Sequence, residues 1–221
     1  GGDAVSTMSL DSRQTINCLA MFTGAITAIM NPDEKSLAYV KDRARIQLDV
    51  EYSDDDAEFS AVHEIDISEL EPIVVVPPRP SNTQNLSEYA GLEVQLGYLG
   101  SCASGRIEDL EIAAKILRGR SVKPGFQLNV VPTSKAIMQE ASEKGILTDL
   151  IAAGAFVTSS SCDYCFGRAG VMTAGQRAVS TGTLNVRGRM GSPDSEIYIM
   201  NAAAVAASAI DGVITDPRKY L

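Results

Sequence analysis

The sequence has little of several features that would each assign it to a class of protein. It contains no run of about 18 uninterrupted apolar residues and no basic-then-apolar leader, so neither a membrane span nor a secretory signal is indicated. Four cysteines in 221 residues are too few for a secreted disulfide framework. A net charge of −9 argues against general nucleic-acid affinity, although locally gathered basic residues could still hold a small anion. We therefore expect a soluble, cytoplasmic protein without nucleic-acid or membrane partners, whose cysteines are available for metal or redox chemistry.

Hydrophobic residues make up 45% of the chain, enough for a substantial core in one large domain or two small ones. The best boundary is the stretch 77–85, where clustered prolines forbid a helix and a polar tail offers nothing to bury. We therefore expect two domains, residues 1–80 and residues 81–221.

The first of these domains begins with a predicted helix over 12–28, which Asn31-Pro32-Asp33 ends. Acidic residues between 51 and 58 suggest calcium, but their spacing matches no EF-hand loop, so a solvated surface is favoured. The alternation of Val62, Ile65 and Ile67 is typical of a strand.

The second domain alternates strand and helix patterns along its length. The expected strands are 94–99, 128–131, 155–158 and 178–181, and the expected helices are 107–118, 135–144, 147–153 and 202–210. This alternation predicts an α/β fold, a three-layer αβα sandwich with a mainly parallel sheet.

Three of the cysteines follow expected strands. Cys102 comes directly after strand 94–99, and Cys162 and Cys165 come after strand 155–158. Because ligands in such folds gather beyond the carboxyl ends of the strands, we expect both groups at one edge of the sheet. A Cys-x-x-Cys can hold two corners of a metal site, and a third cysteine can complete a thiolate face with one coordination position open, as Lewis-acid catalysis requires.

Other interpretations of the cysteines stay open on the residues alone. Cys18 lies among apolar residues of the first helix and is best explained as a small buried hydrophobe. The Cys-x-x-Cys could be a thioredoxin-type redox pair, although it comes late in the chain rather than at the helix of an early βαβ unit. It could also be half of a closed zinc site, but His63, the single histidine, lies in a strand-like segment of the other domain.

Several motifs occur together in an order that resembles a known family. They are Gly-Ser-Cys-Ala-Ser-Gly-Arg-Ile-Glu-Asp-Leu at 100–110, the Cys-x-x-Cys at 162–165, Gly-Arg-Met-Gly at 188–191, the stretch 206–218, Ser-Arg-Gln-Thr-Ile-Asn at 12–17, Gly-Ala at 24–25 and Asn-Pro-Asp at 31–33. The chain is similar to a C-terminal part of the large, catalytic subunit of the aconitase superfamily, of the 3-isopropylmalate dehydratase and homoaconitase type. The resemblance implies an aconitase-like fold, with part of a middle domain in residues 1–80 and the cluster-bearing domain in 81–221.

The resemblance also implies a cofactor and a reaction. Cys102, Cys162 and Cys165 would hold a 4Fe-4S cluster by three irons, which leaves the fourth iron to bind a hydroxy-acid and assist removal of its hydroxyl. The family is a family of hydro-lyases that act on small hydroxy-acids with carboxylate groups. By their places in the motifs, Arg189, Asn185 and Ser104 would bind the substrate.

Some positions depart from the family pattern. Ala103 and Ser104 stand where the family has threonine and asparagine, and Leu184 stands where it has a substrate arginine. Arg187 could compensate for that arginine only if the loop were rebuilt, and an exposed charge is the simpler interpretation. A substrate different from the family's usual ones is therefore favoured.

The family's histidine-aspartate pair and its serine base have no counterpart in these 221 residues, so the catalytic base of this protein is unknown. The resemblance implies two partners that would complete the site, an N-terminal portion of the large subunit and a small swivelling subunit. The alternative is a non-catalytic relative that binds a cluster or serves in assembly.

Overall fold

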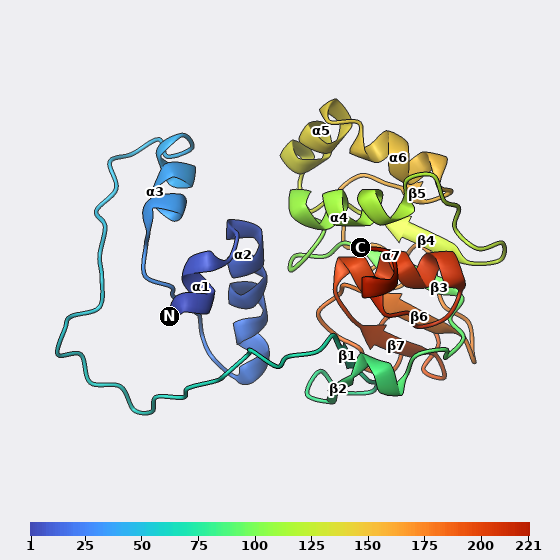
Figure 1. The fold of residues 1–221 in the computed structure, drawn as a ribbon, viewed down its shortest axis with the longest axis horizontal. Coiled ribbons are helices and arrows are strands. Elements are labelled where there is room, and N and C mark those ends of the chain that lie inside the picture. The colour runs from blue at the N-terminus through green and yellow to red at the C-terminus, as the bar shows by residue number, and fades with distance from the viewer. The chain divides into compact units, whose positions relative to one another are not determined.

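The computed structural model describes all 221 residues, which form two compact units, Gly1–Leu70 and Glu71–Leu221. The first unit is helical and the second contains the sheet, as Figure 1 shows. The helices of the first unit are α1 (Asp3–Thr7), α2 (Leu10–Leu19), the 3-10 turn η1 (Ala20–Thr23) and α3 (Glu34–Lys41). The helix expected over 12–28 is thus shorter, because the chain turns at Gly24 in the left-handed conformation.

Arg13 is the buried residue of the first unit and ties its helices together. Its Nη2 lies 2.6 Å from Asp33 Oδ2, and its guanidinium also donates to the carbonyl oxygens of Val5 and Ser6. Asp33 in turn caps α3 by accepting from the Ser36 amide. The segments 12–17 and 31–33, both part of the family resemblance, therefore meet in one ion pair.

Residues 43–69 contain no helix or strand. The prediction of a strand at Val62, Ile65 and Ile67 is wrong, and these side chains are exposed. A single extended segment does not form a stable strand without a partner to satisfy its backbone, and none lies beside this one.

The second unit is built on one seven-stranded sheet with the order β2-β1-β7-β6-β3-β4-β5. Its strands are β1 (Ile73–Val75), β2 (Thr83–Asn85), β3 (Leu96–Leu99), β4 (Gln127–Val130), β5 (Phe156–Val157), β6 (Arg177–Ser180) and β7 (Glu196–Ile199). The five strands from β3 to β7 pair in parallel, whereas β1 is antiparallel to β2 and β7. The expected α/β class with a mainly parallel sheet is confirmed.

The proline-rich stretch 77–85 forms a hairpin rather than a free linker. It turns β1 back into β2, and the Val76 amide donates to the Asn82 carbonyl across the turn. The domain division predicted at residue 80 falls inside this hairpin, whereas the two compact units meet at Leu70 and Glu71. Edge strands tolerate proline because its missing amide is not needed by a neighbour.

Four helices cover one face of the sheet. They are α4 (Ile107–Leu117), α5 (Lys135–Glu143), α6 (Ile146–Ala152) and α7 (Ala202–Asp211), and Figure 1 shows α4 and α7 side by side. The run of alanines in α7 is buried, and such small side chains allow two helices to approach closely. The observed ends of each of these helices lie within two residues of the ends predicted from the sequence. The short helix-like turns η2 (Leu86–Glu88) and η3 (Pro217–Lys219) complete the unit.

A second, smaller core lies on the other face of the sheet, where loops provide the cover. It combines strand residues such as Leu96 and Tyr98 with Tyr164, Cys165 and Met190, which come from the long connections on either side of β6. This core brings the Cys-x-x-Cys segment against the strand that precedes Cys102. None of the helices has the length and apolar character that a membrane crossing needs.

Candidate metal centre

The strand order reverses at β3. The chain moves from β3 to β4 and β5 on one side of the sheet, and then returns to place β6 and β7 on the other side. Crevices that bind ligands form at such a reversal, beyond the carboxyl ends of the parallel strands. Cys102 lies in the loop after β3, and Cys162 and Cys165 lie after β5. The expected placement of the cysteines at one sheet edge is therefore met.

Thr181 joins the carboxyl ends of β3 and β6. Its Oγ1 accepts a hydrogen bond from the Gly100 amide and donates one to the Gly100 carbonyl, each at 2.8 Å. Ser101 follows with a φ of 98°, a conformation that is costly for a residue with a side chain, and its hydroxyl donates to the Thr181 carbonyl. The backbone is thus forced into a sharp turn immediately before Cys102.

The loop that carries Cys102 packs tightly against the neighbouring strand. A Cβ at Gly100 would lie 2.7 Å from the Val131 carbonyl oxygen, so only glycine fits there. Beyond the cysteine, the Thr133 hydroxyl donates to the Ser104 carbonyl and Arg106 Nη2 donates to the Cys102 carbonyl at 3.0 Å. These bonds fix the loop backbone while the Cys102 side chain is exposed.

The Cys-x-x-Cys segment folds as a tight turn. The Phe166 amide donates to the Cys162 carbonyl at 3.0 Å, and the Arg168 amide donates to the Asp163 carbonyl. Cys165 is buried in the smaller core, whereas Cys162 is exposed beside a hollow of about 160 Å³ that Phe166 and Arg168 also line.

Arg189 reaches the Cys-x-x-Cys from the connection between β6 and β7. Its Nη2 lies 3.2 Å from Cys165 Sγ, and its guanidinium stacks 3.8 Å from the centre of the Phe166 ring. Arg189 could instead have been a structural residue paired with Asp194 or Glu196, but no ion pair joins it to either acid, and Glu196 is bonded to Arg177. The guanidinium is therefore held at a cysteine rather than at an acid.

Tyr98 is buried beside both cysteine loops. Cys165 shares its core, and the loop of Cys102 begins over its hydroxyl. Burial raises the pKa of Tyr98, the negative charges that Cys165, Cys162 and Cys102 can carry raise it further, and Arg189 partly offsets them. Tyr98 was not predicted from the sequence, although a phenol two residues before the glycine of the Cys102 loop, in an otherwise apolar strand, was a signal that could have found it.

The residues present fit an iron–sulfur cluster by the chemistry of their donors. None of the cysteines is in a disulfide, so three soft sulfur ligands are available from two loops. Arg189 and Tyr98 place N–H and O–H groups among them, which suits a sulfur-rich anion. No three histidine, cysteine or acidic side chains converge tightly enough to hold a metal ion, so the three cysteines do not form an assembled ligand set in this structure.

The other residues expected to bind substrate lie beside this site or away from it. Ser104 is buried in the Cys102 loop, and its hydroxyl has no hydrogen bond. Asn185 is also buried, but its amide donates at 3.4 Å to the Val75 carbonyl of β1 rather than to the cysteine loops, and its Oδ1 has no partner.

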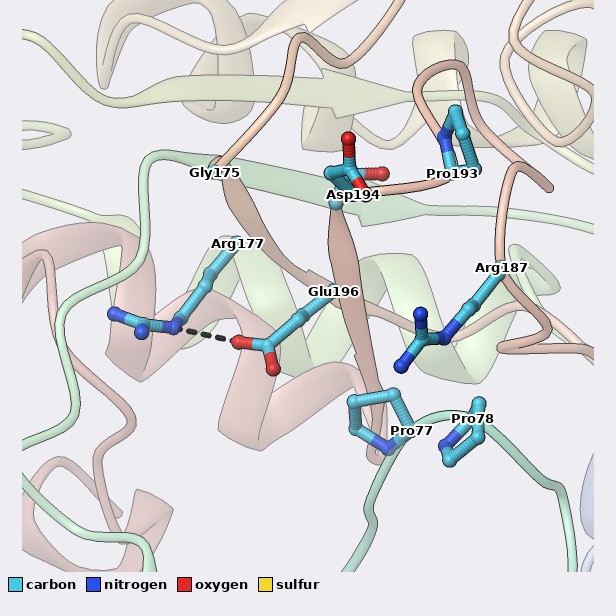
Figure 2. A pocket seen from close by; sticks show the side chains of 9 residues that line it. Pro77, Pro78, Gly175, Arg177, Arg187, Pro193, Asp194 and Glu196 are labelled. Atoms are coloured by element: carbon cyan, nitrogen blue, oxygen red, sulfur yellow. Dashed lines mark hydrogen bonds and ion pairs between the residues drawn. The ribbon is translucent and has the colours of Figure 1, made fainter.

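A larger pocket of about 390 Å³ lies at the amino ends of β6 and β7, the end of the sheet opposite the cysteine loops. Figure 2 shows Glu196 between Arg177 and Arg187, with the ion pair running to Arg177. Arg187 is exposed in this pocket, as the simpler interpretation of its charge expected. It does not occupy a place beside Cys165 as Arg189 does.

Comparison with known proteins agrees with this architecture. The sequence matches the aconitase family (aconitate hydratase) over residues 1–91 and 82–212. It is 41% identical over 98% of its length to a 3-isopropylmalate dehydratase large subunit of Aquifex aeolicus, of which it covers 51%. Large subunits of the same name from Halothermothrix orenii and Pyrococcus abyssi are each 39% identical over the whole chain, which covers 53% of each. The chain spans about half the length of these curated relatives, a C-terminal part of them. With its motifs, its sheet and its sequence in agreement, the chain belongs to the aconitase family.

Proposed function

We propose that this chain provides the cluster-bearing part of an iron–sulfur hydro-lyase that acts on a small hydroxy-acid with carboxylate groups. The observations that support the proposal are the two cysteine loops at one edge of the sheet and the contact of Arg189 with Cys165. The names of the relatives support a dehydratase, because each is a 3-isopropylmalate dehydratase large subunit.

In this proposal Cys102, Cys162 and Cys165 hold a 4Fe-4S cluster. When bound, the cluster supplies a Lewis-acidic iron without a protein ligand, which can accept a hydroxyl leaving from a carbon next to a carboxylate. The turn at Ser101 and the clamp made by Thr181 keep the Cys102 loop in place for this ligation. Holding ligands on fixed backbone reduces the entropy lost when the cofactor binds.

Arg189 is proposed to orient the substrate beside the cluster. Its Nη2 faces Cys165, whereas its Nε is buried without a partner and is free to donate to a carboxylate. Ser104 offers a buried hydroxyl in the Cys102 loop, and Asn185 offers a buried amide oxygen on the connection that carries Arg189. The base that takes the substrate proton is proposed to come from protein outside these 221 residues, either the remaining portion of the large subunit or a small subunit.

The alternative is a relative that keeps the cluster without catalysis. The observation that favours it is the loss of one family arginine: Leu184 stands at that position, and Arg187 lines the pocket with Arg177 and Glu196 instead. A dicarboxylate would then lack the contact that this arginine makes in the family, which costs about 1.5–3 kcal/mol of binding for the missing charge-assisted hydrogen bonds.

The test is anaerobic reconstitution with iron and sulfide, with and without a candidate small subunit and the missing large-subunit portion. We expect the spectrum of a 4Fe-4S cluster in the chain and dehydration of a hydroxy-diacid only in the completed assembly. Cluster formation without turnover on any hydroxy-diacid would favour the non-catalytic alternative. A triple Cys102→Ser, Cys162→Ser, Cys165→Ser variant that still binds the cluster would refute the proposed ligands.

A further inference from the structure

Tyr98 is the most enclosed polar side chain of the smaller core, and its hydroxyl makes no hydrogen bond. The residue is 0% exposed, and its Oη is buried without a partner. Leaving a buried hydroxyl without a partner is unfavourable, so native proteins rarely keep one without a reason. A hydroxyl of this kind points to an acceptor that arrives from outside the chain.

The surroundings of the Tyr98 hydroxyl indicate where such an acceptor would lie. Tyr98 shares its core with Cys165 and Tyr164, on the face of the sheet that the Cys-x-x-Cys loop covers. A Cβ at Gly100 would lie 3.1 Å from the Tyr98 hydroxyl, so the start of the Cys102 loop passes directly over it. The phenol is thus enclosed by both loops that carry the proposed ligands.

The groups near the hydroxyl indicate what kind of acceptor it suits. Cys165 lies in the same core as the phenol, and the loop of Cys102 begins directly over its hydroxyl. An O–H group that two cysteine loops enclose is suited to a sulfur acceptor that bears negative charge.

We propose that the Tyr98 O–H donates a hydrogen bond to a sulfur of the iron–sulfur cluster, either an inorganic sulfide or a cysteine ligand, and thereby raises the reduction potential of the cluster. This inference rests on the proposed function, because it requires the cluster. Hydrogen bonds to the sulfurs stabilise the more negative, reduced state of a cluster, which is how they tune its potential. Tyr98 is therefore a positioning and tuning residue, not a ligand.

The proposal predicts opposite effects of Tyr98→Phe on stability in the protein without the cluster and in the protein with it. Without the cluster, Tyr98→Phe removes a buried hydroxyl that has no partner, so the apo-protein should melt at a higher temperature. With the cluster, the same change removes a hydrogen bond, so the gain in melting temperature on cluster binding should be smaller in Tyr98→Phe than in the unmodified chain.

The experiment compares the whole chain with Tyr98→Phe and Tyr198→Phe after anaerobic reconstitution. Tyr198 is a matched control, because it lies in the same sheet but its hydroxyl already donates to Glu196. The readouts are the reduction potential, measured by a redox titration followed spectroscopically, and the melting temperatures of the apo and reconstituted proteins. We expect a more negative potential in Tyr98→Phe, faster loss of iron to a chelator, and an unchanged potential in Tyr198→Phe.

The outcomes separate this inference from the proposed function. If the unmodified chain takes up no cluster, both fail. If it takes up a cluster whose potential is the same in Tyr98→Phe, the cluster stands and the hydrogen bond from Tyr98 is refuted. Because the apo form of Tyr98→Phe should be at least as stable as the unmodified chain, a fall in its melting temperature would also overturn the inference.

Discussion

The structure gives Arg189 contacts that its sequence motif does not indicate. Its place in the motif indicates a substrate arginine, but in the folded chain its Nη2 contacts Cys165 and one face of its guanidinium stacks on Phe166. Both contacts need a planar, forked cation, which lysine lacks. The residue therefore combines a structural contact at a proposed ligand with a donor, Nε, that is still available.

Replacing Arg189 by lysine in the completed enzyme separates these two roles. We expect kcat/KM to fall about 10- to 150-fold, which corresponds to about 1.5–3 kcal/mol for one lost charge-assisted hydrogen bond. The cluster spectrum should be unchanged, because lysine keeps a cation near Cys165. Steady-state kinetics and absorption spectra measure both effects. Turnover close to normal would remove Arg189 from the substrate site, and loss of the cluster would make it a structural residue.

The ion pair between Arg13 and Asp33 predicts how the first unit responds to acid. Hydrogen bonds from Arg13, then from Ser36, lower the pKa of Asp33 well below its usual range. A carboxyl with a lowered folded pKa stabilises the fold above its unfolded pKa of about 4, and this contribution is lost as the pH falls through the folded value. The first unit should therefore lose helix as the pH falls from neutral to strongly acidic values. Asp33→Asn, which removes the carboxylate, should show a similar loss of helix already at neutral pH. Melting curves recorded across this pH range measure both effects.

The control for this prediction lies on the same helix. Asp42→Asn removes a carboxylate from the other end of α3 and leaves the pair with Arg13 intact. It should melt like the unmodified chain at neutral pH. Equal losses of helix in the two variants would show that the pair does not hold the first unit together.

At the scale of elements, the junction between β3 and β6 is the structural basis of the cysteine site. Thr181 Oγ1 satisfies both the amide and the carbonyl of Gly100, and all of these atoms are buried or partly buried. The start of the Cys102 loop is therefore held by one hydroxyl that comes 81 residues later in the chain, whereas Thr133 and Arg106 hold the loop beyond it.

Thr181→Val should destabilise the second unit by about 1–3 kcal/mol, because it leaves a buried amide and carbonyl without partners while it keeps the side-chain shape. Thr181→Ser keeps the hydroxyl and should retain most of the stability. Urea unfolding measures the free energy, and the rate at which a maleimide labels Cys102 reports the freedom of its loop. Identical stability and labelling in the valine and serine variants would show that the clamp is not needed.

The elements that sequence patterns predict best are those whose apolar spacing is decided locally. Ile107, Leu110, Ala114 and Leu117 lie on one stripe of α4, and the helix forms with nearly the expected ends. The strand expected at Val62 fails, because an alternating pattern says nothing about whether a partner strand is present. Strands β1, β2 and β7 were not predicted, because β1 pairs with β7 across more than 120 residues of sequence and the prolines of 77–85 concealed the hairpin of β1 and β2.

The site was predictable to a similar degree. The three cysteines and their shared sheet edge follow from strand ends and spacing. The contact of Arg189 with Cys165 and the enclosure of Tyr98 do not, because they depend on how the two loops fold back over the sheet. The place of Asn185 against β1 likewise depends on a hairpin that the prolines of 77–85 concealed.

At the scale of the whole molecule, the two units differ in how many of their apolar side chains are buried. Both hydrophobic cores consist of residues from Glu71–Leu221, whereas Arg13 is the buried residue of Gly1–Leu70. Large side chains such as Ile26, Ile29 and Phe59 are exposed in the first unit. The second unit thus has the apolar burial that an independently stable domain needs.

We expect residues 71–221 expressed alone to unfold cooperatively and, if the proposed function holds, to take up as much iron and sulfide as the whole chain. Circular dichroism during heating and the cluster absorption after reconstitution test this expectation. The whole chain is the reference, and its main unfolding transition should occur at nearly the same temperature as that of residues 71–221. A broad, non-cooperative transition in the shorter chain would mean that the first unit contributes to the core of the second.

The reversal of strand order at β3 also sets a sequence of events during synthesis. Strand β3 emerges before its neighbour β6, which follows with the Thr181 clamp about 80 residues later, after both cysteine loops. Pairing between strands so far apart is slow, and until it occurs the Cys102 loop lacks the Thr181 bonds that hold its first turn. Cys165, which the folded chain buries, is therefore accessible to oxidants until the fold is complete, whereas Cys102 and Cys162 stay exposed in the fold. Under the proposed function, iron and sulfide would be delivered to a nearly complete fold rather than to an emerging chain.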